Sequence, residues 1–524
     1  AACMKHFLGY SMPRTGKDRT PVYIDEIQLR EYFLPTFQAA INAGAATVMI
    51  NSGELNGIPV HADKKILTDL LRSELGFKGV AVTDWEDIMK LNNIHMVAPT
   101  LKDAVYMAID AGIDMCMVPN DYDFTILLTE LVKEGKISEA RLDVSVKRIL
   151  ELKKQLGLFE QPFTPANTDY KKFGSTEFAR AAQNMAEESI TLLKNNNQVL
   201  PIQQSAKILV TGPAANSMTY LNGAWTRTWQ GTDTIWNDQS KYTIREAFNP
   251  ATTTFIASDN MSDTDVREKM FAAAKASDVI IICLGEKPST EKVGDIDALT
   301  MPDNQQQLVG LLKSTGKPVV LVLVENRPLI VNDIEPLCDA IVLAYEPGDY
   351  GGLALANIIY GKVNPSGKLP FTYPRHEASL LWYDHKHTET LDQTFGRKAF
   401  NPQWEFGYGL SYTTFQYSNL KISNDTLSTG NLQISVDVTN TGTTTGKEVV
   451  QFYIADRYAS ITPSVKRLRG FEKVEIKPGA THIVTFTISA KDLAFVGRDE
   501  KWISEAGWFD IMLGSEKSSF YLSK

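Results

Sequence analysis

The sequence predicts a multidomain α/β protein that ends in an all-β domain, and three patterns along the chain support this. Residues 1–160 alternate short apolar strands with amphipathic helices, residues 175–375 contain continuous apolar runs, and residues 413–524 alternate apolar with polar side chains. Strands separated by helices predict parallel sheets, whereas the two-residue period predicts half-buried antiparallel strands. A chain of 524 residues is too long for one core, so we expect about three domains.

The first region, residues 1–160, predicts part of a parallel α/β domain. Strands are expected at Ala1–Phe7, Ala46–Asn51, Gly79–Asp84 and Ile113–Val118. Helices are expected at Gln28–Ala43, Leu67–Leu75, Leu101–Ala111 and Ser138–Phe159. A closed barrel of this kind needs eight strand–helix units, and this region supplies only half of them. We therefore expect either an open sheet or a barrel whose other half lies upstream.

A second α/β domain is expected at residues 175–375, after a linker at 161–174. Its strands should lie at Lys207–Thr211, Val279–Leu284, Pro318–Val324 and Ala340–Ala344. Continuous apolar runs of this kind are typical of strands covered on both faces. A second linker, residues 376–412, leads to residues 413–524, where alternation and turn signals such as NTGTTTG and KPGA predict a β-sandwich.

Composition places the chain among ordinary globular proteins and excludes some functions. Hydrophobic residues make up 43% and charged residues 22%, as in typical folded domains. The net charge of −9 argues against nucleic-acid binding, because phosphates require a concentrated basic surface. No apolar run reaches the roughly 18 residues that a membrane span needs. The cysteines have no zinc-site or CxxC spacing, so we predict buried thiols at Cys3, Cys116, Cys283 and Cys338.

The segment VAVTDWED contains the first candidate catalytic residue, Asp84. Asp84 ends an apolar strand, and the carboxyl ends of barrel strands hold catalytic groups. It could equally cap the helix that follows. Trp85 beside it favours the catalytic interpretation, because an indole next to a carboxylate suits the apolar face of a sugar.

The second candidate segment is LGEKPSTEKVGDIDALTMP, which follows the strand Val279–Leu284. It contains Glu286, Glu291, Asp295 and Asp297 in a loop beyond a strand's carboxyl end, where open α/β sheets bind ligands. An acidic loop is more often plain solvated surface. Together with Asp84, however, it makes the paired-carboxylate chemistry of glycoside cleavage available.

These segments belong to a set of six that occur in the order found in glycoside hydrolase family 3, and the chain resembles that family along essentially its whole length. The segments are KHFLGY, GFKGVAVTDWEDI, GAWTRTWQG, GEKPSTEKVGD, EPGDYGGLALANIIYGKVNPSGKLPFTYP and WEFGYGLSYTTF. The resemblance implies a (β/α)8 TIM-like barrel, here partial, then an α/β sandwich and a C-terminal fibronectin type III-like β-sandwich.

The resemblance also implies roles for individual residues. Asp84 matches the family's nucleophile and Glu291 the acid/base of its β-glucosidase branch. Lys5 and His6 match a pair that hydrogen-bonds sugar hydroxyls, and Trp85 and Trp225 match two rings that sandwich the aglycone-side sugar. The implied substrate-binding set is Lys5, His6, Met49, Trp85 and Trp225.

Three features depart from the family pattern. An Asp and an Arg that bind the non-reducing-end sugar would precede residue 1, so we expect the chain to lack the N-terminal part of its barrel. Ser52 stands where the family often has a Tyr, in the segment MINSGELNG. The Glu-bearing loop around Glu291 argues against the N-acetylglucosaminidase branch, which uses a His in a barrel loop.

The expected function is that of a retaining exo-β-glycosidase acting on terminal β-D-glucosyl residues of oligosaccharides and glucosides, with no metal or organic cofactor. The two carboxyl groups should lie roughly 5–5.5 Å apart when a sugar is bound. The resemblance also implies a periplasmic or extracellular location. An upstream half-barrel segment and a homodimer are expected as partners.

Other functions stay open at this stage. A β-xylosidase or an α-L-arabinofuranosidase would share the fold, because fold does not fix the sugar. A non-catalytic sugar-binding fragment is the alternative outside the enzymes. A nucleotide-binding protein is excluded, since no GxGxxG or GxxxxGK[ST] motif follows a strand and the nearest candidate, VTGPAAN, lacks the glycines.

Overall fold

The computed structural model describes residues 1–524 except 121, 164–169, 259–260, 391–398 and 524. The chain forms two compact units. Unit 1 contains Ala1–Tyr170 and Phe495–Ile503, and unit 2 contains Lys171–Ala494 and Ser504–Lys524. Each unit is described by itself below.

Unit 1 is built on a parallel sheet with the strand order β1-β2-β5. Its strands are β1 (Cys3–Phe7), β2 (Thr47–Ile50) and β5 (Val80–Val82), and two short strands, β3 (Glu54–Leu55) and β4 (Ile58–Pro59), form a hairpin. The helices are α1 (Glu26–Gln28), η1 (Leu29–Phe33), α2 (Leu34–Asn42), η2 (Val60–Ala62), η3 (Lys65–Glu74), α3 (Asp87–Asn93), α4 (Leu101–Ala111), α5 (Asp123–Lys133) and α6 (Glu139–Gln155). This alternation confirms the α/β pattern predicted for the region.

The strand predicted at Ile113–Val118 is wrong. Met115 makes only an isolated parallel bridge to Val82. The reason is that the carboxylate of Asp114 turns inward and accepts the Ala81 N–H at 3.0 Å, so a side chain occupies a position that a strand carbonyl would take. Cys3 also differs from the prediction, because it is exposed on β1, an edge strand of the described sheet.

A buried ionic network around Asp114 joins β5 to two helices of unit 1. Arg72, on η3, donates to Asp114 Oδ2 at 2.6 Å, and Arg148, on α6, donates to Oδ1 at 2.8 Å. The Ser145 hydroxyl donates to the same Oδ1 at 2.6 Å. With the Ala81 N–H, both oxygens of this buried carboxylate have two donors each. A buried charge needs such pairing, so β5 can lie in only one position relative to these helices.

A hairpin from the C-terminal region also belongs to unit 1. It consists of β18 (Phe495–Val496) and β19 (Trp502–Ile503). The Val496 N–H donates to Glu31 Oε2, on η1, at 3.2 Å. Nothing in the local sequence distinguishes this hairpin from its neighbours, since its packing partner lies hundreds of residues away.

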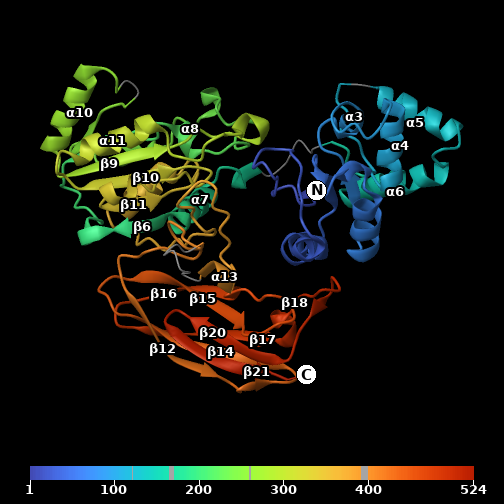
Figure 1. Ribbon diagram of the computed structural model, residues 1–524. Coiled ribbons are helices and arrows are strands. Elements are labelled where there is room, and N and C mark those ends of the chain that lie inside the picture. Colours follow the sequence, from blue (N-terminus) through green and yellow to red (C-terminus); the bar gives the residue numbers. More distant parts are fainter. Residues whose placement is uncertain (121, 164–169, 259–260, 391–398, 524) are drawn as a thin grey trace. The chain divides into compact units, whose positions relative to one another are not determined.

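Unit 2 begins with a six-stranded sheet covered by helices on both faces (Figure 1). The strand order is β6-β11-β10-β9-β7-β8, for strands β6 (Thr191–Asn195), β7 (Ile208–Thr211), β8 (Thr253–Phe255), β9 (Val279–Gly285), β10 (Val319–Val324) and β11 (Ala340–Leu343). The pairs are parallel except that β6 runs antiparallel to β11. Four of these strands were predicted. The other two, β6 and β8, are short edge strands without a long apolar run.

Alternate residues of the central strands pack against different helix layers, as a sandwich requires. Ile281 and Cys283 pack in the cluster that contains α12, whereas Ile280 and Ile282 pack in the cluster that contains α10 and α11. The helices of this region are α7 (Thr176–Ser189), η5 (Asn196–Gln198), α8 (Met218–Leu221), η6 (Thr234–Trp236), α9 (Ile244–Ala247), α10 (Thr264–Ala276), η7 (Glu291–Gly294), α11 (Asp303–Lys313), η8 (Glu335–Leu337) and α12 (Gly351–Ile359).

The rest of unit 2 is the predicted β-sandwich. One sheet has the order β12-β14-β17 and the other β13-β21-β20-β15-β16. Their strands are β12 (Phe415–Ile422), β13 (Thr426–Leu427), β14 (Asn431–Asn440), β15 (Gly446–Asp456), β16 (Arg467–Ile476), β17 (Thr481–Ser489), β20 (Gly507–Leu513) and β21 (Glu516–Leu522). Every second residue of β14 from Leu432 to Val438 is buried, which confirms the predicted alternation.

Across the described parts of both units, none of the helices has the length and apolar character needed to cross a membrane.

Replacing Asp114 with Asn should destabilise unit 1, because Arg72 and Arg148 would lose their buried counter-charge. We expect the free energy of unfolding to fall by about 3–5 kcal/mol, measured by urea-induced unfolding followed by circular dichroism. Asp110→Asn is the matched control, since Asp110 forms an exposed pair with Lys64 and should cost about 1 kcal/mol or less. Equal effects of the two substitutions would contradict this prediction.

Candidate active site

Asp84 lies at the carboxyl end of β5 and is held by several donors. The Trp85 N–H donates to Asp84 Oδ1 at 2.6 Å, and the Ser52 hydroxyl donates to Oδ2 at 3.0 Å. Arg19 Nη2 lies 3.3 Å and His6 Nε2 3.6 Å from Oδ2. The residue is only 8% exposed, so this carboxylate is ordered and partly shielded from water.

The topology explains why these groups meet. His6 lies on β1, Ser52 comes just after β2 and Asp84 just after β5, and these three strands are parallel neighbours. The carboxyl ends of parallel strands lie at one edge of the sheet, which is where barrel enzymes place reactive groups. Glu86 has a positive φ of 58°, so the chain turns sharply there into α3.

The surroundings hold the pKa of Asp84 below its usual value. Burial alone raises this pKa, but the hydrogen bonds from Trp85 N–H and Ser52 and the charges of Arg19 and His6 outweigh it. Asp84 is therefore ionised across the neutral range. An ionised carboxylate with a fixed orientation has the properties of a nucleophile.

Behind Asp84 lies a second buried carboxylate, Asp87. The Ser52 hydroxyl shares its single proton between Asp84 Oδ2 and Asp87 Oδ2, which lies 2.7 Å away, and Lys90 Nζ donates to Asp87 Oδ1 at 2.6 Å. His61 Nε2 lies 3.4 Å from Oδ2, and burial lowers the pKa of His61 despite the nearby charge of Asp87. Lys90 also donates to the Trp85 carbonyl at 2.8 Å. Through Lys90, this network holds the backbone at Trp85, directly after the candidate nucleophile.

The other predicted residues of unit 1 lie on or shortly after the strands β1, β2 and β5. Lys5 is an exposed residue of β1, next to His6, and Met49 pairs with Val82 in the register of β2 with β5. The indole of Trp85 is 51% exposed beside Asp84. These positions agree with a substrate-binding role, which stays a prediction.

Arg19 is a site residue that sequence reasoning missed. It contacts Asp84 and also forms an ion pair with Asp18, which in turn accepts the hydroxyl of Tyr10. The Tyr10 ring lies 4.5 Å from the His6 ring, measured between centroids. Arg19 stands in a loop without periodicity, so only the tertiary structure reveals its contact with Asp84. In the sequence, the one feature that could have indicated Arg19 as a site residue is an arginine in a loop that contains Thr and Gly.

In unit 2, Glu291 begins η7 in the loop after β9. The indole N–H of Trp229 donates to Glu291 Oε1 at 3.1 Å. The neighbouring residues form a reciprocal pair, in which Thr290 N–H donates to Gln230 Oε1 at 3.0 Å and Gln230 Nε2 donates to the Thr290 carbonyl at 3.1 Å. The segment GAWTRTWQG therefore holds the acidic loop. Trp225, in the same segment, is 63% exposed.

Arg327, which was also missed, clamps both ends of the loop that carries Glu291. Its Nε donates to the two oxygens of Glu286 at 2.9 and 3.0 Å. Its Nη1 donates to the Gly294 carbonyl at 2.8 Å, and its Nη2 lies 3.3 Å from Ser289 Oγ. One guanidinium thus connects the beginning, the middle and the end of the loop, a task suited to its planar fork of donors.

A second arginine holds the segment that contains Trp225. Arg227 Nη2 donates to both oxygens of Asp349, at 2.7 and 2.5 Å, and Asn222 Nδ2 donates to Asp349 Oδ1 at 3.0 Å. At Gly223 the segment passes so close to Glu346 that an added Cβ would lie 2.3 Å from Oε2. Burial, with a smaller effect of Glu286, raises the pKa of Glu346.

Replacing Arg327 with Met should loosen the loop that carries Glu291, since four hydrogen bonds are lost, two of them to a charged group. Trypsin should then cleave after the exposed Lys292 about tenfold faster or more, measured by mass spectrometry of timed digests; Lys287 gives no tryptic site because Pro288 follows it. Arg267→Met, at an exposed position on α10, is the control. Unchanged cleavage at Lys292 would show that Arg327 does not hold the loop.

The sequence matches three domain families in order. It matches the glycosyl hydrolase family 3 N terminal domain over residues 1–152, the glycosyl hydrolase family 3 C-terminal domain over 190–412 and the fibronectin type III-like domain over 448–517. These ranges cover both candidate carboxylates and the β-sandwich.

Curated and solved relatives agree with these matches. The chain is 43% identical to a lysosomal β-glucosidase of Dictyostelium discoideum, covering 99% of the chain and 66% of the relative. It is 33% identical to a periplasmic β-glucosidase of Salmonella typhimurium, covering 98% and 72%. A Listeria innocua β-glucosidase solved with isofagomine superposes with a TM-score of 0.92 at 30% identity, covering 100% and 75%.

The three matched domain families correspond, in order, to the expected barrel, α/β sandwich and fibronectin-like regions. The chain spans 66% and 72% of the lengths of the Dictyostelium and Salmonella relatives. From the domain matches, the identities and the structural superposition, we conclude that the chain belongs to glycoside hydrolase family 3.

Proposed function

We propose that the protein is a retaining exo-β-glucosidase, with Asp84 as nucleophile and Glu291 as acid/base. The observation that carries the proposal is the ionised, oriented carboxylate of Asp84 at the carboxyl end of β5. Family membership supports glycoside hydrolysis as the chemistry. The β-glucosidase names of the Dictyostelium and Salmonella relatives support glucose as the sugar.

In the proposed first step, a carboxylate oxygen of Asp84 attacks the anomeric carbon and the glycosidic C–O bond breaks. Glu291 gives its proton to the departing oxygen, which leaves as an alcohol. In the second step, a water molecule gives a proton to Glu291 and its oxygen attacks the same carbon, which releases Asp84. Two inversions give net retention and restore both carboxyl groups.

The neighbours of Asp84 have complementary roles in this proposal. Arg19 and His6 keep Asp84 anionic before attack, and Lys5 and His6 hydrogen-bond sugar hydroxyls. Trp85 and Trp225, both exposed, stack on the aglycone-side sugar. Stacking uses the apolar face that every pyranose offers, so we expect loose aglycone specificity.

We also propose a location outside the cytoplasm, supported by the periplasmic location in the name of the Salmonella relative. The upstream barrel segment and the homodimer stay predictions, as does the separation of the two carboxyl groups.

Hydrolysis of 4-nitrophenyl β-D-glucoside tests the proposal directly. Asp84→Asn should lower kcat by about 10³-fold or more, because no other group replaces the attacking oxygen. Glu291→Ala should lower kcat/KM by about 10²–10⁴-fold for glucosides with poor leaving groups. For the nitrophenyl substrate, azide should restore turnover in Glu291→Ala alone, since this anion attacks the glycosyl-enzyme without base assistance.

Three outcomes would separate the alternatives. Faster hydrolysis of the 4-nitrophenyl β-D-xyloside or α-L-arabinofuranoside than of the β-D-glucoside would identify the protein as a β-xylosidase or an α-L-arabinofuranosidase. Saccharide binding without any turnover would favour the binding-protein alternative. Full activity in Asp84→Asn would refute the assignment of the nucleophile.

The environment of Asp84 predicts the acid limb of the pH–rate profile. The reaction needs ionised Asp84, so kcat/KM should fall only as the pH drops through its lowered pKa, below 3.8. Ser52→Ala removes a donor to the charged form, which raises this pKa and should move the acid limb to higher pH. Ser52→Thr keeps a hydroxyl and should move it much less. Identical profiles for all three proteins would contradict this account.

A further inference from the structure

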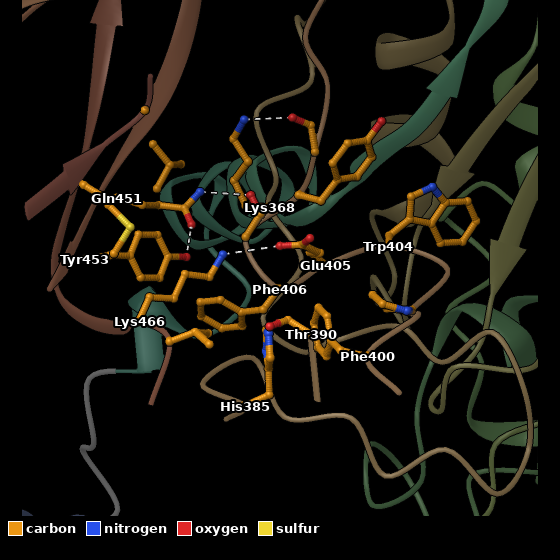
Figure 2. Close-up of a pocket in the computed structure, with 18 of the residues that line it drawn as sticks. Lys368, His385, Thr390, Phe400, Trp404, Glu405, Phe406, Gln451, Tyr453 and Lys466 are labelled. Carbon is orange, nitrogen blue, oxygen red and sulfur yellow. Dashed lines mark hydrogen bonds and ion pairs between the residues drawn. The ribbon is translucent and has the colours of Figure 1, made fainter. Parts of the chain in front are cut away.

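A large pocket in unit 2 lies where the β-sandwich meets the segment that precedes it. It has a volume of about 1010 Å³, at the upper end of the range of about 300–1,000 Å³ for small-molecule sites. On one side lie Gln451 and Tyr453 of β15 and Lys466, which directly precedes β16, and on the other lie Phe400 and Trp404 (Figure 2). Neither Glu291 nor any other residue predicted for catalysis lines this pocket.

We propose that this pocket is a second, non-catalytic binding site for a β-linked oligosaccharide. The choice of a β-glucosidic ligand rests on the proposed function, whereas the choice of a saccharide rests on the chemistry of the lining. A saccharide is neutral, polyhydroxylated and apolar on its ring faces, and each of these properties has a counterpart in the pocket.

Aromatic rings supply the apolar surfaces. Among the described residues, six of them line the pocket, namely Phe400, Trp404, Phe406, Tyr408, Tyr417 and Tyr453. Two are held in place by neighbours outside the lining, since Phe406 stacks on Tyr383 at 4.5 Å and Trp404 meets Tyr373 edge-on at 5.0 Å. Rigid rings lose little entropy on binding and can stack on sugar faces.

Charged side chains of both signs supply hydrogen-bonding groups. Lys466 and Glu405 form an ion pair at 3.3 Å from opposite sides of the pocket (Figure 2), and Lys368 lies 3.3 Å from Glu448. These two ion pairs neutralise four of the five Lys and Glu side chains in the described lining, and Lys517 leaves one positive charge. A neutral ligand with many hydroxyls can accept from the lysines and donate to the carboxylates.

The test measures binding in an Asp84→Asn background, where a bound sugar is not consumed. Cellotetraose and laminaritetraose are titrated by calorimetry into this protein and into versions that also carry Lys466→Ala or Trp404→Ala. We expect the pocket substitutions to weaken or remove one binding event by about tenfold or more. Phe471→Ala is the matched control, because Phe471 is 67% exposed on β16 outside the pocket. Lys466→Ala changes a surface ion pair, so it still tests the pocket if Trp404→Ala fails to fold.

Hydrolysis of 4-nitrophenyl β-D-glucoside, measured with Asp84 restored, distinguishes the two proposals. Normal hydrolysis in Lys466→Ala with a lost binding event supports a separate site. Normal hydrolysis with no binding event sensitive to Lys466→Ala or Trp404→Ala overturns this inference and leaves the proposed function standing. Neither hydrolysis nor tetraose binding in the unsubstituted chain overturns both. Equal weakening by Phe471→Ala would also overturn the assignment to this pocket.

Discussion

The buried carboxylate of Asp114 is the constraint on which the candidate active site depends. Four donors surround it, two of them arginines from different helices, and the fourth is the Ala81 N–H of β5. Since burying a charge is costly unless its partners are in place, this arrangement leaves β5 one position. Asp84 follows two residues after the end of that strand, so its location is set by a network that touches no part of the site itself.

Unit 2 positions its candidate acid/base differently. Glu291 lies in a loop rather than at a strand end, and a loop has few packing contacts to hold it. Arg327 and the segment around Gln230 replace those contacts with hydrogen bonds to backbone and side chains. The clamp leaves the carboxyl group of Glu291 near the indole of Trp229. Unit 1 thus fixes a core carboxylate, Asp114, with two arginines, and unit 2 fixes the loop carboxylate of Glu286 with one.

Much of the fold could be predicted because its signals are local. The helix at Leu101–Ala111 has the predicted bounds, and the central strands β9 and β10 lie within a residue of theirs, since long apolar runs and glycine stops act over a few residues. The strand at Ile113–Val118 was wrong because the side chain of Asp114 competes for a ladder position. The edge strand β8 was missed because its sequence has no apolar run.

By itself, the sequence determined the family, the order of the domains and the identity of the candidate carboxylates, since motifs such as VTDWED and GEKPSTE are contiguous in the chain. Only the tertiary structure decided which side chains tune and hold those carboxylates. Arg19 lies 65 residues from Asp84 and Arg327 lies 41 residues from Glu286, and no periodicity relates such positions. The same holds for the pocket around Trp404 and Lys466, which forms only when the β-sandwich packs on the segment before it. Contacts of this kind come from burial and electrostatics across the folded unit, which local patterns do not encode.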